Sequence, residues 1–269
     1  STSNILVVKA GERQETIYGG DEEQLTSAVL AVTSGEKARV CFLTGHGELS
    51  LEDTQGTGIG TIKRTLEDQQ YEVGELNLSS EETPTIPGDC AVLVIAGPTE
   101  EIRKEEIDAI AAYARQGGNL LIGLESRGPS LVALLSEYGI EPRDGSIRDR
   151  DAGYIGAADI PMVQIGGDHR IIESLESVPI AMVTPRSLEI AQTGMEDPMT
   201  GMPPQQLAQP LLQSLPSAWI EQAGSASAGR DAGEAGGPFT VAAVVDATQP
   251  QQPNPMMPAP EEQTGPRMV

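Results

Sequence analysis

Four short strand-like runs, separated by helical patterns, constrain the fold more than any other feature of this sequence. The runs are Ala38–Leu43, Tyr71–Leu76, Cys90–Ala96 and Asn119–Leu124, and helical patterns lie at Ile59–Leu66, Glu105–Arg115 and Leu131–Tyr138. Most of the runs are continuously apolar, which is typical of parallel strands that are covered on both faces. With right-handed crossovers, this order predicts an α/β fold: a flavodoxin-like, doubly wound, mainly parallel sheet with helices on both faces.

The segments around this core divide the chain further. Residues 1–35 predict a small N-terminal β-hairpin, from Ile5–Lys9 and Gln14–Tyr18, followed by a helix that Asp21 caps. Residues 36–246 form the predicted α/β core domain. Within the core, we expect a long irregular Gly/Pro-rich excursion at 194–237 and a returning strand at 238–246. The Pro/Gln-rich residues 247–269 predict a disordered tail.

The candidate site is the turn that follows the first run of the core. It comprises Thr44, Gly45, His46, Gly47 and Glu48, and this end of a parallel strand is where open α/β sheets bind ligands. His46 and Glu48 could act as acid and base, or bind a metal ion or a sugar hydroxyl. Alternatively, the glycines shape a tight turn that His46 only caps or packs. Because the sequence offers no second histidine or nucleophile nearby, it favours a binding or structural role over catalysis.

Other candidate groups are weaker. Glu125 ends the fourth run, and we expect it to be a rim carboxylate at the same edge of the sheet as His46. The glycines of Gly56–Thr61 follow no strand directly and lack the dinucleotide spacing, so we predict no nucleotide cofactor there. Neither Cys41 nor Cys90 stands at a nucleophile elbow. Since one is mid-strand and the other begins a strand, we expect two buried core thiols rather than a disulfide.

Composition excludes several classes of function. The chain of 269 residues has 17 Lys+Arg against 40 Asp+Glu, a net charge of −23, which argues against nucleic acid or an anionic membrane as partner. Two His and two Cys cannot form the usual four-ligand zinc site without carboxylates, so we predict no metal and no cofactor. The apolar stretches are far shorter than the roughly 20 residues that span a bilayer, and no signal peptide opens the chain.

The run Val40–Glu48, Val-Cys-Phe-Leu-Thr-Gly-His-Gly-Glu, carries a family resemblance. It is similar to the signature of the auxiliary proteins of uncharacterised ABC-type transport systems, a group that includes the gliding-motility protein GldG and shares a domain with intraflagellar-transport proteins. Further blocks match in order across nearly the whole chain: Glu23–Val29, Ala91–Pro98, Glu105–Tyr113, Gly117–Leu121, Ser217–Glu221 and Gly237–Ala242.

The resemblance implies a non-catalytic accessory domain that binds a ligand or partner protein at the carboxyl edge of the sheet. The implied partners are ABC transporter permease and ATPase subunits, and a small ligand or sugar. The implied location is extracytoplasmic, on the periplasmic side, in a protein anchored to the inner membrane. The resemblance also implies that residues 1–35 are the edge of a preceding domain, and that Arg267–Val269 begin a further strand before a membrane helix.

Two alternatives from other classes remain open. A hydrolase or amidotransferase-like enzyme would use His46 with a carboxylate, and it requires a concave pocket in which a nucleophile lies near the imidazole. A carbohydrate-binding module is suggested only by analogy of fold. The aromatic content of 3% counts against the second alternative, because sugar faces usually stack on Trp or Tyr.

Overall fold

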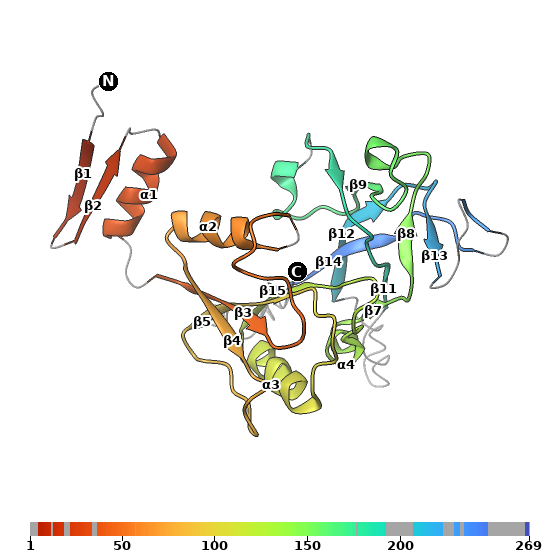
Figure 1. The fold of residues 1–269 in the computed structure, drawn as a ribbon, viewed down its shortest axis with the longest axis horizontal. Helices are drawn as coiled ribbons and strands as arrows, with labels where there is room; N and C mark the ends of the chain where they lie inside the picture. Colours follow the sequence, from red (N-terminus) through yellow and green to blue (C-terminus); the bar gives the residue numbers. More distant parts are fainter. Residues whose placement is uncertain are drawn as a thin grey trace, which may run out of the picture.

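The structure of the chain is a computed structural model that describes residues 5–11, 13–18, 22–33, 37–56, 58–175, 177–191, 207–222, 229–231, 234–246 and 267–268. The N-terminal hairpin and helix are confirmed. Strands β1 (Ile5–Ala10) and β2 (Arg13–Tyr18) pair antiparallel, and α1 (Glu22–Thr33) packs on them with Ala28 and Val32 buried. Figure 1 shows this unit set apart from the rest of the chain.

The four predicted core strands form a parallel sheet. They are β3 (Arg39–Thr44), β4 (Glu72–Asn77), β5 (Cys90–Ala96) and β6 (Asn119–Gly123), in the order β4-β3-β5-β6. All three pairings are parallel. This order matches the first four strand positions of flavodoxin-like sheets, so the prediction of an α/β domain is confirmed.

Alternate residues of β3 explain why its sequence is continuously apolar. Val40 and Phe42 pack with Leu51 and Ile59, which leads into α2 (Gly60–Asp68). Cys41 and Leu43 point to the other face, where Ile110 of α3 (Lys104–Arg115) is fully buried. Helices α2 and α3 therefore lie on opposite faces of the sheet (Figure 1), and the short α4 (Val132–Leu135) contacts α3.

The second half of the sheet differs from the prediction, because it is antiparallel. Its strands are β14 (Thr240–Asp246), β12 (Ala208–Ser214), β9 (Met162–Ile165) and β10 (Ile180–Ala181), in that order. Strand β15 (Arg267–Met268) pairs parallel with β6 and antiparallel with β14, and so joins the two halves into one 11-stranded sheet. The sheet is thus mixed rather than mainly parallel.

Short elements complete the architecture. Strand β7 (Ile140–Pro142) pairs with β11 (Leu188–Ile190), and β8 (Ser146–Arg148) pairs with β13 (Trp219–Glu221) in a separate ribbon. Short 3-10 turns lie at Ser136–Tyr138, Tyr154–Gly156 and Glu173–Leu175. None of the helices within the described ranges is long and apolar enough to cross a bilayer.

The excursion predicted at 194–237 contains two of these strands. Strand β12 lies between β14 and β9, so it is part of the core. The sequence of β12 does not indicate a core strand, because Pro210 and two glutamines interrupt the apolar pattern. Its ladder with β14 also shifts register between Pro210 and Leu212. A strand follows the excursion at Thr240–Asp246, and Arg267–Met268 form a short strand within the segment 247–269 that was predicted to be a disordered tail. The rest of the predicted excursion and tail falls mostly outside the described residues.

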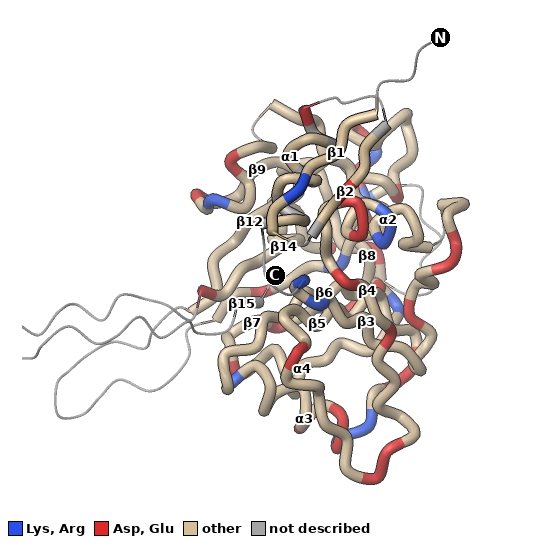
Figure 2. The backbone as a smooth tube through the Cα atoms, turned by 90° about the vertical axis from the view of Figure 1, so that its left-hand side faces the viewer, with Lys and Arg blue, Asp and Glu red and all other residues tan. Residues whose placement is uncertain are grey.

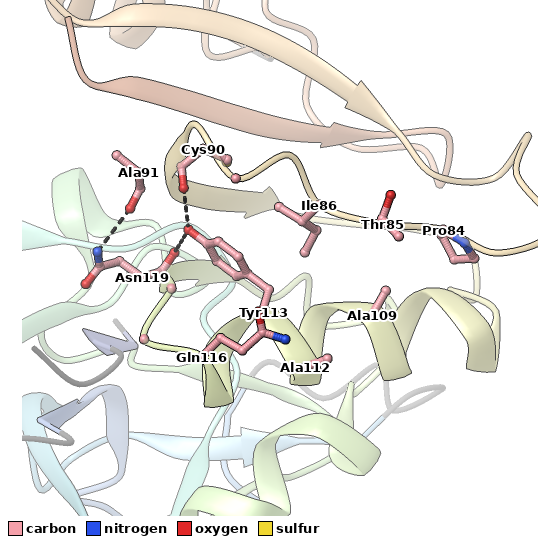
Figure 3. A pocket seen from close by; sticks show the side chains of 13 residues that line it. Pro84, Thr85, Ile86, Cys90, Ala91, Ala109, Ala112, Tyr113, Gln116 and Asn119 are labelled. Atoms are coloured by element: carbon pink, nitrogen blue, oxygen red, sulfur yellow. Dashed lines mark hydrogen bonds between the residues drawn. The ribbon is translucent and has the colours of Figure 1, made fainter. Parts of the chain in front are cut away.

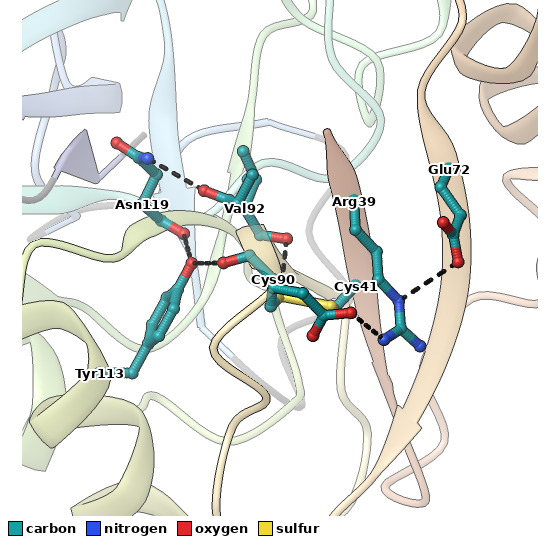
Figure 4. Close-up of a disulfide and its surroundings, with 9 residues drawn as sticks. Arg39, Cys41, Glu72, Cys90, Val92, Tyr113 and Asn119 are labelled. Atoms are coloured by element: carbon teal, nitrogen blue, oxygen red, sulfur yellow. Dashed lines mark hydrogen bonds and ion pairs between the residues drawn. A yellow bond between two sulfur atoms is a disulfide. The ribbon is translucent and has the colours of Figure 1, made fainter. Parts of the chain in front are cut away.

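The two cysteines correct a further expectation, because they form a disulfide (Figure 4). Cys41 and Cys90 lie on the adjacent strands β3 and β5, with Cα atoms 5.9 Å apart. Strand β5 begins opposite Arg39, and a register shift directly after this pair places Cys90 diagonally across from Cys41, on the same face. The strand positions of the two residues, mid-strand and first, are therefore compatible with a cross-strand bond.

Candidate functional site

The candidate turn lies where the order of the parallel strands reverses. From β3 the chain moves to β4 on one side of it, and then crosses to β5 on the other side. In open α/β sheets such a switch point leaves a crevice at the carboxyl ends of the two diverging strands, here β3 and β5. Thr44 ends β3 and residues 45–48 follow it, and Gly97-Pro98 follow β5, so both segments border this position.

Side chains of the protein itself fill this position. The His46 side chain is about 5% exposed and lies between two glutamates, with Nδ1 3.0 Å from Glu48 Oε1 and Nε2 2.8 Å from Glu106 Oε2. The contact with Glu106 is close but lacks the alignment of a good hydrogen bond. The second oxygen of Glu48, Oε2, accepts the backbone N–H of His46 at 2.7 Å.

Arg103 extends the network to a third loop. Its Nε donates to Oε1 of Glu106, which is fully buried at the start of α3. Its Nη2 donates to the backbone carbonyls of Leu78 and Glu81, both at 3.1 Å, in the loop that follows β4. Glu48, His46, Glu106 and Arg103, the carboxyl-edge cluster, therefore connect the loops after β3 and β4 to α3.

Backbone geometry fixes the turn. Gly45 has φ +116° and Gly47 has φ +73°, which are left-handed conformations that favour glycine. A Cβ on Gly47 would also clash with Thr99. The N–H groups of Thr99 and Glu100 both donate to the carbonyl of His46 at 2.9 Å, which holds the turn against the loop after β5. This geometry matches the interpretation in which the glycines shape a tight turn that His46 packs.

Around the His46 ring, the described residues place carboxylates. In the described residues, no serine, threonine or cysteine side chain hydrogen bonds to the His46 ring, whose two nitrogens face carboxylates. The enzyme alternative needs a nucleophile there, and the geometry provides none. The described part of the chain also contains no group of three or more His, Cys, Asp or Glu arranged to hold a metal ion.

Glu125 lies apart from the cluster. Its side chain lies beside Gly97, because a Cβ on that glycine would be 3.1 Å from Glu125 Oε1. Its carbonyl accepts Nη1 of Arg186 at 3.3 Å. Within the described ranges, no hydrogen bond or ion pair joins Glu125 to His46 or Glu48. The structure thus brings Thr44, Gly45, His46, Gly47 and Glu48 together in one turn and leaves Glu125 beyond the end of β6, two strands away from β3.

Sequence reasoning missed Glu106 and Arg103. Glu106 precedes Ile110 by one helical turn, so it lies on the stripe of α3 that faces the core. A carboxylate on an apolar stripe indicates a buried charge that needs a partner. The position of Glu106 could therefore have indicated a buried charge from the sequence, but not that its partners are His46 and Arg103.

A cavity of about 570 Å³ lies at the amino ends of the parallel strands β5 and β6, opposite the carboxyl edge (Figure 3). Its main polar groups are bonded to the backbone. Tyr113 Oη donates to the carbonyl of Cys90 at 3.1 Å, and Asn119 Nδ2 donates to that of Ala91 at 3.0 Å. Burial raises the pKa of the Tyr113 hydroxyl, which keeps it protonated as a donor. These bonds lie beside the disulfide and bind α3 and β6 to the start of β5.

Comparisons with known proteins identify a family. The model of the family described as "ABC-type uncharacterized transport system" matches residues 37–263, which include the whole carboxyl-edge cluster. No curated protein matches the chain. Among solved structures, the mmIFT52 N-terminal domain is similar over 86% of this chain and 84% of its own, with 16% identity and a TM-score of 0.54, a likeness of fold.

Other solved structures are more distant. A putative ThuA-like protein from Bacteroides uniformis has 11% identity and a TM-score of 0.41, with 68% of this chain and 70% of its own covered. A glutamine amidotransferase from Thermotoga maritima has 13% identity and a TM-score of 0.40, with 67% and 68% covered.

Proposed function

The chain belongs to the family of auxiliary components of ABC-type uncharacterized transport systems, and from this premise we propose that it is a non-catalytic docking domain. In this proposal it binds a partner protein of its transport system at the carboxyl edge of the parallel sheet. ATP hydrolysis takes place in a separate ATPase subunit. The domain works outside the cytoplasm, on the periplasmic side, in a protein that is anchored to the inner membrane.

The single observation that carries this proposal is the internal pairing of the carboxyl-edge cluster. At the position where α/β sheets usually receive a ligand, His46 is held between Glu48 and Glu106, and Arg103 neutralises the second carboxylate. These internal contacts hold three loops in fixed positions, which is what a pre-organised protein interface requires.

The exposed surface around the cluster favours a basic partner. Glu81 and Glu82 lie in the loop after β4, and Glu100 and Glu101 lie in the loop after β5; all four are exposed. Figure 2 shows acidic residues over much of the backbone and fewer basic ones, in keeping with the net charge of −23. Opposite charge on a partner would speed association and select the correct surface.

The disulfide supports the extracytoplasmic location. Cys41 and Cys90 are joined, and disulfides persist in oxidising compartments but are rare in the cytosol. An accessory domain that meets the permease from the outside would work in such a compartment.

Co-purification tests the proposal. The full-length protein, extracted from its own membranes in mild detergent, should bring down an ABC permease and an ATPase in fixed proportion. The charge-reversal variant Glu100→Lys/Glu101→Lys should lose most of both subunits. The matched variant Asp168→Lys/Glu173→Lys changes two exposed acidic residues far from the edge in sequence and should retain them. Recovery of the full-length protein without either subunit would contradict the proposal.

A further inference from the structure

The face of the parallel sheet that carries α2 is covered over only part of its width. Val40 and Phe42 of β3 are buried there, in a cluster to which Leu66 of α2 contributes. Val94 of β5 belongs to the same cluster and lies in register with Leu121 of β6, so both side chains point to this face. Leu121 is nevertheless 44% exposed. The cover over this face therefore becomes thinner from β3 toward β6.

An open cavity of about 570 Å³ lies over this face, and we name it the sheet groove. It is distinct from the cavity at the amino ends of β5 and β6, with which it shares no lining residue. Strands β3, β5 and β6 contribute apolar lining, and α2 adds Ile62, which is 53% exposed. Apolar surface of this kind, gathered in one place and open to solvent, marks an interaction site.

The two ends of the groove differ in charge. Gln69 and Tyr71 line it near the amino end of β4, whereas Glu125 lines it at the carboxyl edge, beside Gly97. Arg186 donates to the backbone carbonyl of Glu125 and pairs its charge with Asp144. Within the described ranges, the carboxylate of Glu125 makes no hydrogen bond or ion pair. The groove thus has an unpaired negative charge at its carboxyl end.

The length and chemistry of the groove define what fits it. Val92 and Gly97 of the β5 segment both line it, and at about 3.3 Å per residue they lie about 17 Å apart. This distance equals about three turns of an α-helix at roughly 5.4 Å per turn. The apolar stripe of an amphipathic helix would cover Ile62 and Leu121, as in other helix-in-groove complexes. A basic side chain at one end would pair with Glu125.

We propose that the sheet groove binds an amphipathic helix of about three turns, which belongs to a subunit of the transport system and carries Lys or Arg beside Glu125. This rests on the proposed function and names the part of the partner that the domain recognises. Helices normally cover both faces of a parallel sheet, so the bound helix would supply the cover that β6 lacks. Because Glu125 lies at the carboxyl edge, the helix would reach the edge at which Glu100 and Glu101 attract the partner.

The affinity of the chain for a purified permease–ATPase complex of the transport system tests the groove. Leu121→Asp places a charge on the apolar floor and should weaken binding about tenfold or more. Its side chain is already partly exposed, so the fold should persist, which circular dichroism checks. Val178→Asp is the matched control, at a residue 52% exposed that does not line the groove, and should bind unchanged. Glu125→Lys should also weaken binding, because it reverses the charge at the carboxyl end.

Photo-cross-linking identifies the occupant. Leu121→p-benzoylphenylalanine, irradiated in the purified complex, should cross-link to a subunit peptide whose apolar residues recur every three or four positions and which carries Lys or Arg at one end. The same replacement at Val178 should give no such product. A cross-link between two copies of this chain would assign the groove to a second copy and overturn the proposal.

The outcomes separate this proposal from the proposed function. Suppose that Leu121→Asp and Glu125→Lys bind as the original chain does, while Glu100→Lys/Glu101→Lys loses affinity. The helix in the groove would then be overturned, and docking at the carboxyl edge would stand. No binding of the original chain to the complex would contradict both.

Discussion

Substitution Glu106→Gln tests whether the carboxyl-edge cluster stabilises the fold. The change keeps the size and one carbonyl acceptor of the side chain but removes its charge. In this variant, His46 keeps one carboxylate partner of two, and Arg103 loses the only carboxylate that it contacts among the described residues. Since Glu106 is fully buried, water cannot replace what is lost there.

The size of the effect follows from burial. Removing one partner of a buried ion pair costs about 3–5 kcal/mol. The Arg103 side chain is 42% exposed and can rehydrate, so we expect the lower figure of about 2–3 kcal/mol. In a domain of this size, 1 kcal/mol corresponds to about 2–4 °C in melting temperature. The variant should therefore melt about 4–12 °C below the original chain.

The assay is urea unfolding followed by circular dichroism, with thermal unfolding alongside. The midpoint should fall with an unchanged slope, since the amount of surface exposed on unfolding stays the same. Glu105→Gln is the matched control: it is the neighbouring residue on α3, exposed to solvent, and should change stability by less than about 1 kcal/mol. If Glu106→Gln costs no more than Glu105→Gln, the cluster does not stabilise the fold and our reasoning is wrong.

Three other perturbations have defined outcomes. Cys41→Ser/Cys90→Ser removes a cross-link between residues 49 apart in sequence and should lower the free energy of unfolding by about 2–4 kcal/mol. Thiol titration of the unreduced, denatured original chain should find no free thiol. A count of two free thiols would contradict the disulfide. Gly47→Ala should lower the free energy of unfolding, measured in urea, clearly more than Gly156→Ala. Both glycines have positive φ (73° and 77°), which costs about 1–2 kcal/mol for alanine, but only a Cβ on Gly47 would clash, with Thr99. Equal losses would show that the turn shifts to relieve this clash. Trp219→Phe removes the buried hydrogen bond from Nε1–H to Glu221 Oε2 (2.9 Å) and should lower the free energy of unfolding by about 1–3 kcal/mol. Red-shifted fluorescence of Trp219 in the folded original chain would contradict its burial.

The sequence predicted the parallel half of the fold because its signals are local. Residues 40–43 of β3 are buried and apolar on both faces, so the pattern is readable without knowing the partner strands. Helix α3 carries its stripe of Ile107, Ile110, Ala111 and Ala114 for the same reason. Strand direction followed from the helices α2 and α3, which connect β3 to β4 and β5 to β6.

The antiparallel half could not be predicted in this way. Strand β12 contains Pro210, which lacks the N–H that a central strand needs for its ladder. The ladder of β12 with β14 also shifts register on either side of Leu212, which the local sequence does not indicate. The disulfide depends on a register shift between β3 and β5, which is also a non-local property.

The candidate site was predicted in part. The glycines of the Thr44–Glu48 turn marked its position and its tight geometry, because positive φ is costly for other residues. The partner of His46 comes from α3, 60 residues further along the chain, and no pattern in the sequence joins the two. The buried contact between His46 and Glu106 depends on how α3 packs on the sheet, so only the structure shows it.

The affinity of the isolated chain for a purified permease–ATPase complex of the transport system tests the central claim most directly, the claim that the carboxyl edge docks a transport subunit. Our account predicts saturable binding that weakens at least tenfold in Glu100→Lys/Glu101→Lys, weakens with added salt, and is unchanged in Asp168→Lys/Glu173→Lys. Equal affinity of both variants, or no binding of the original chain, would contradict it.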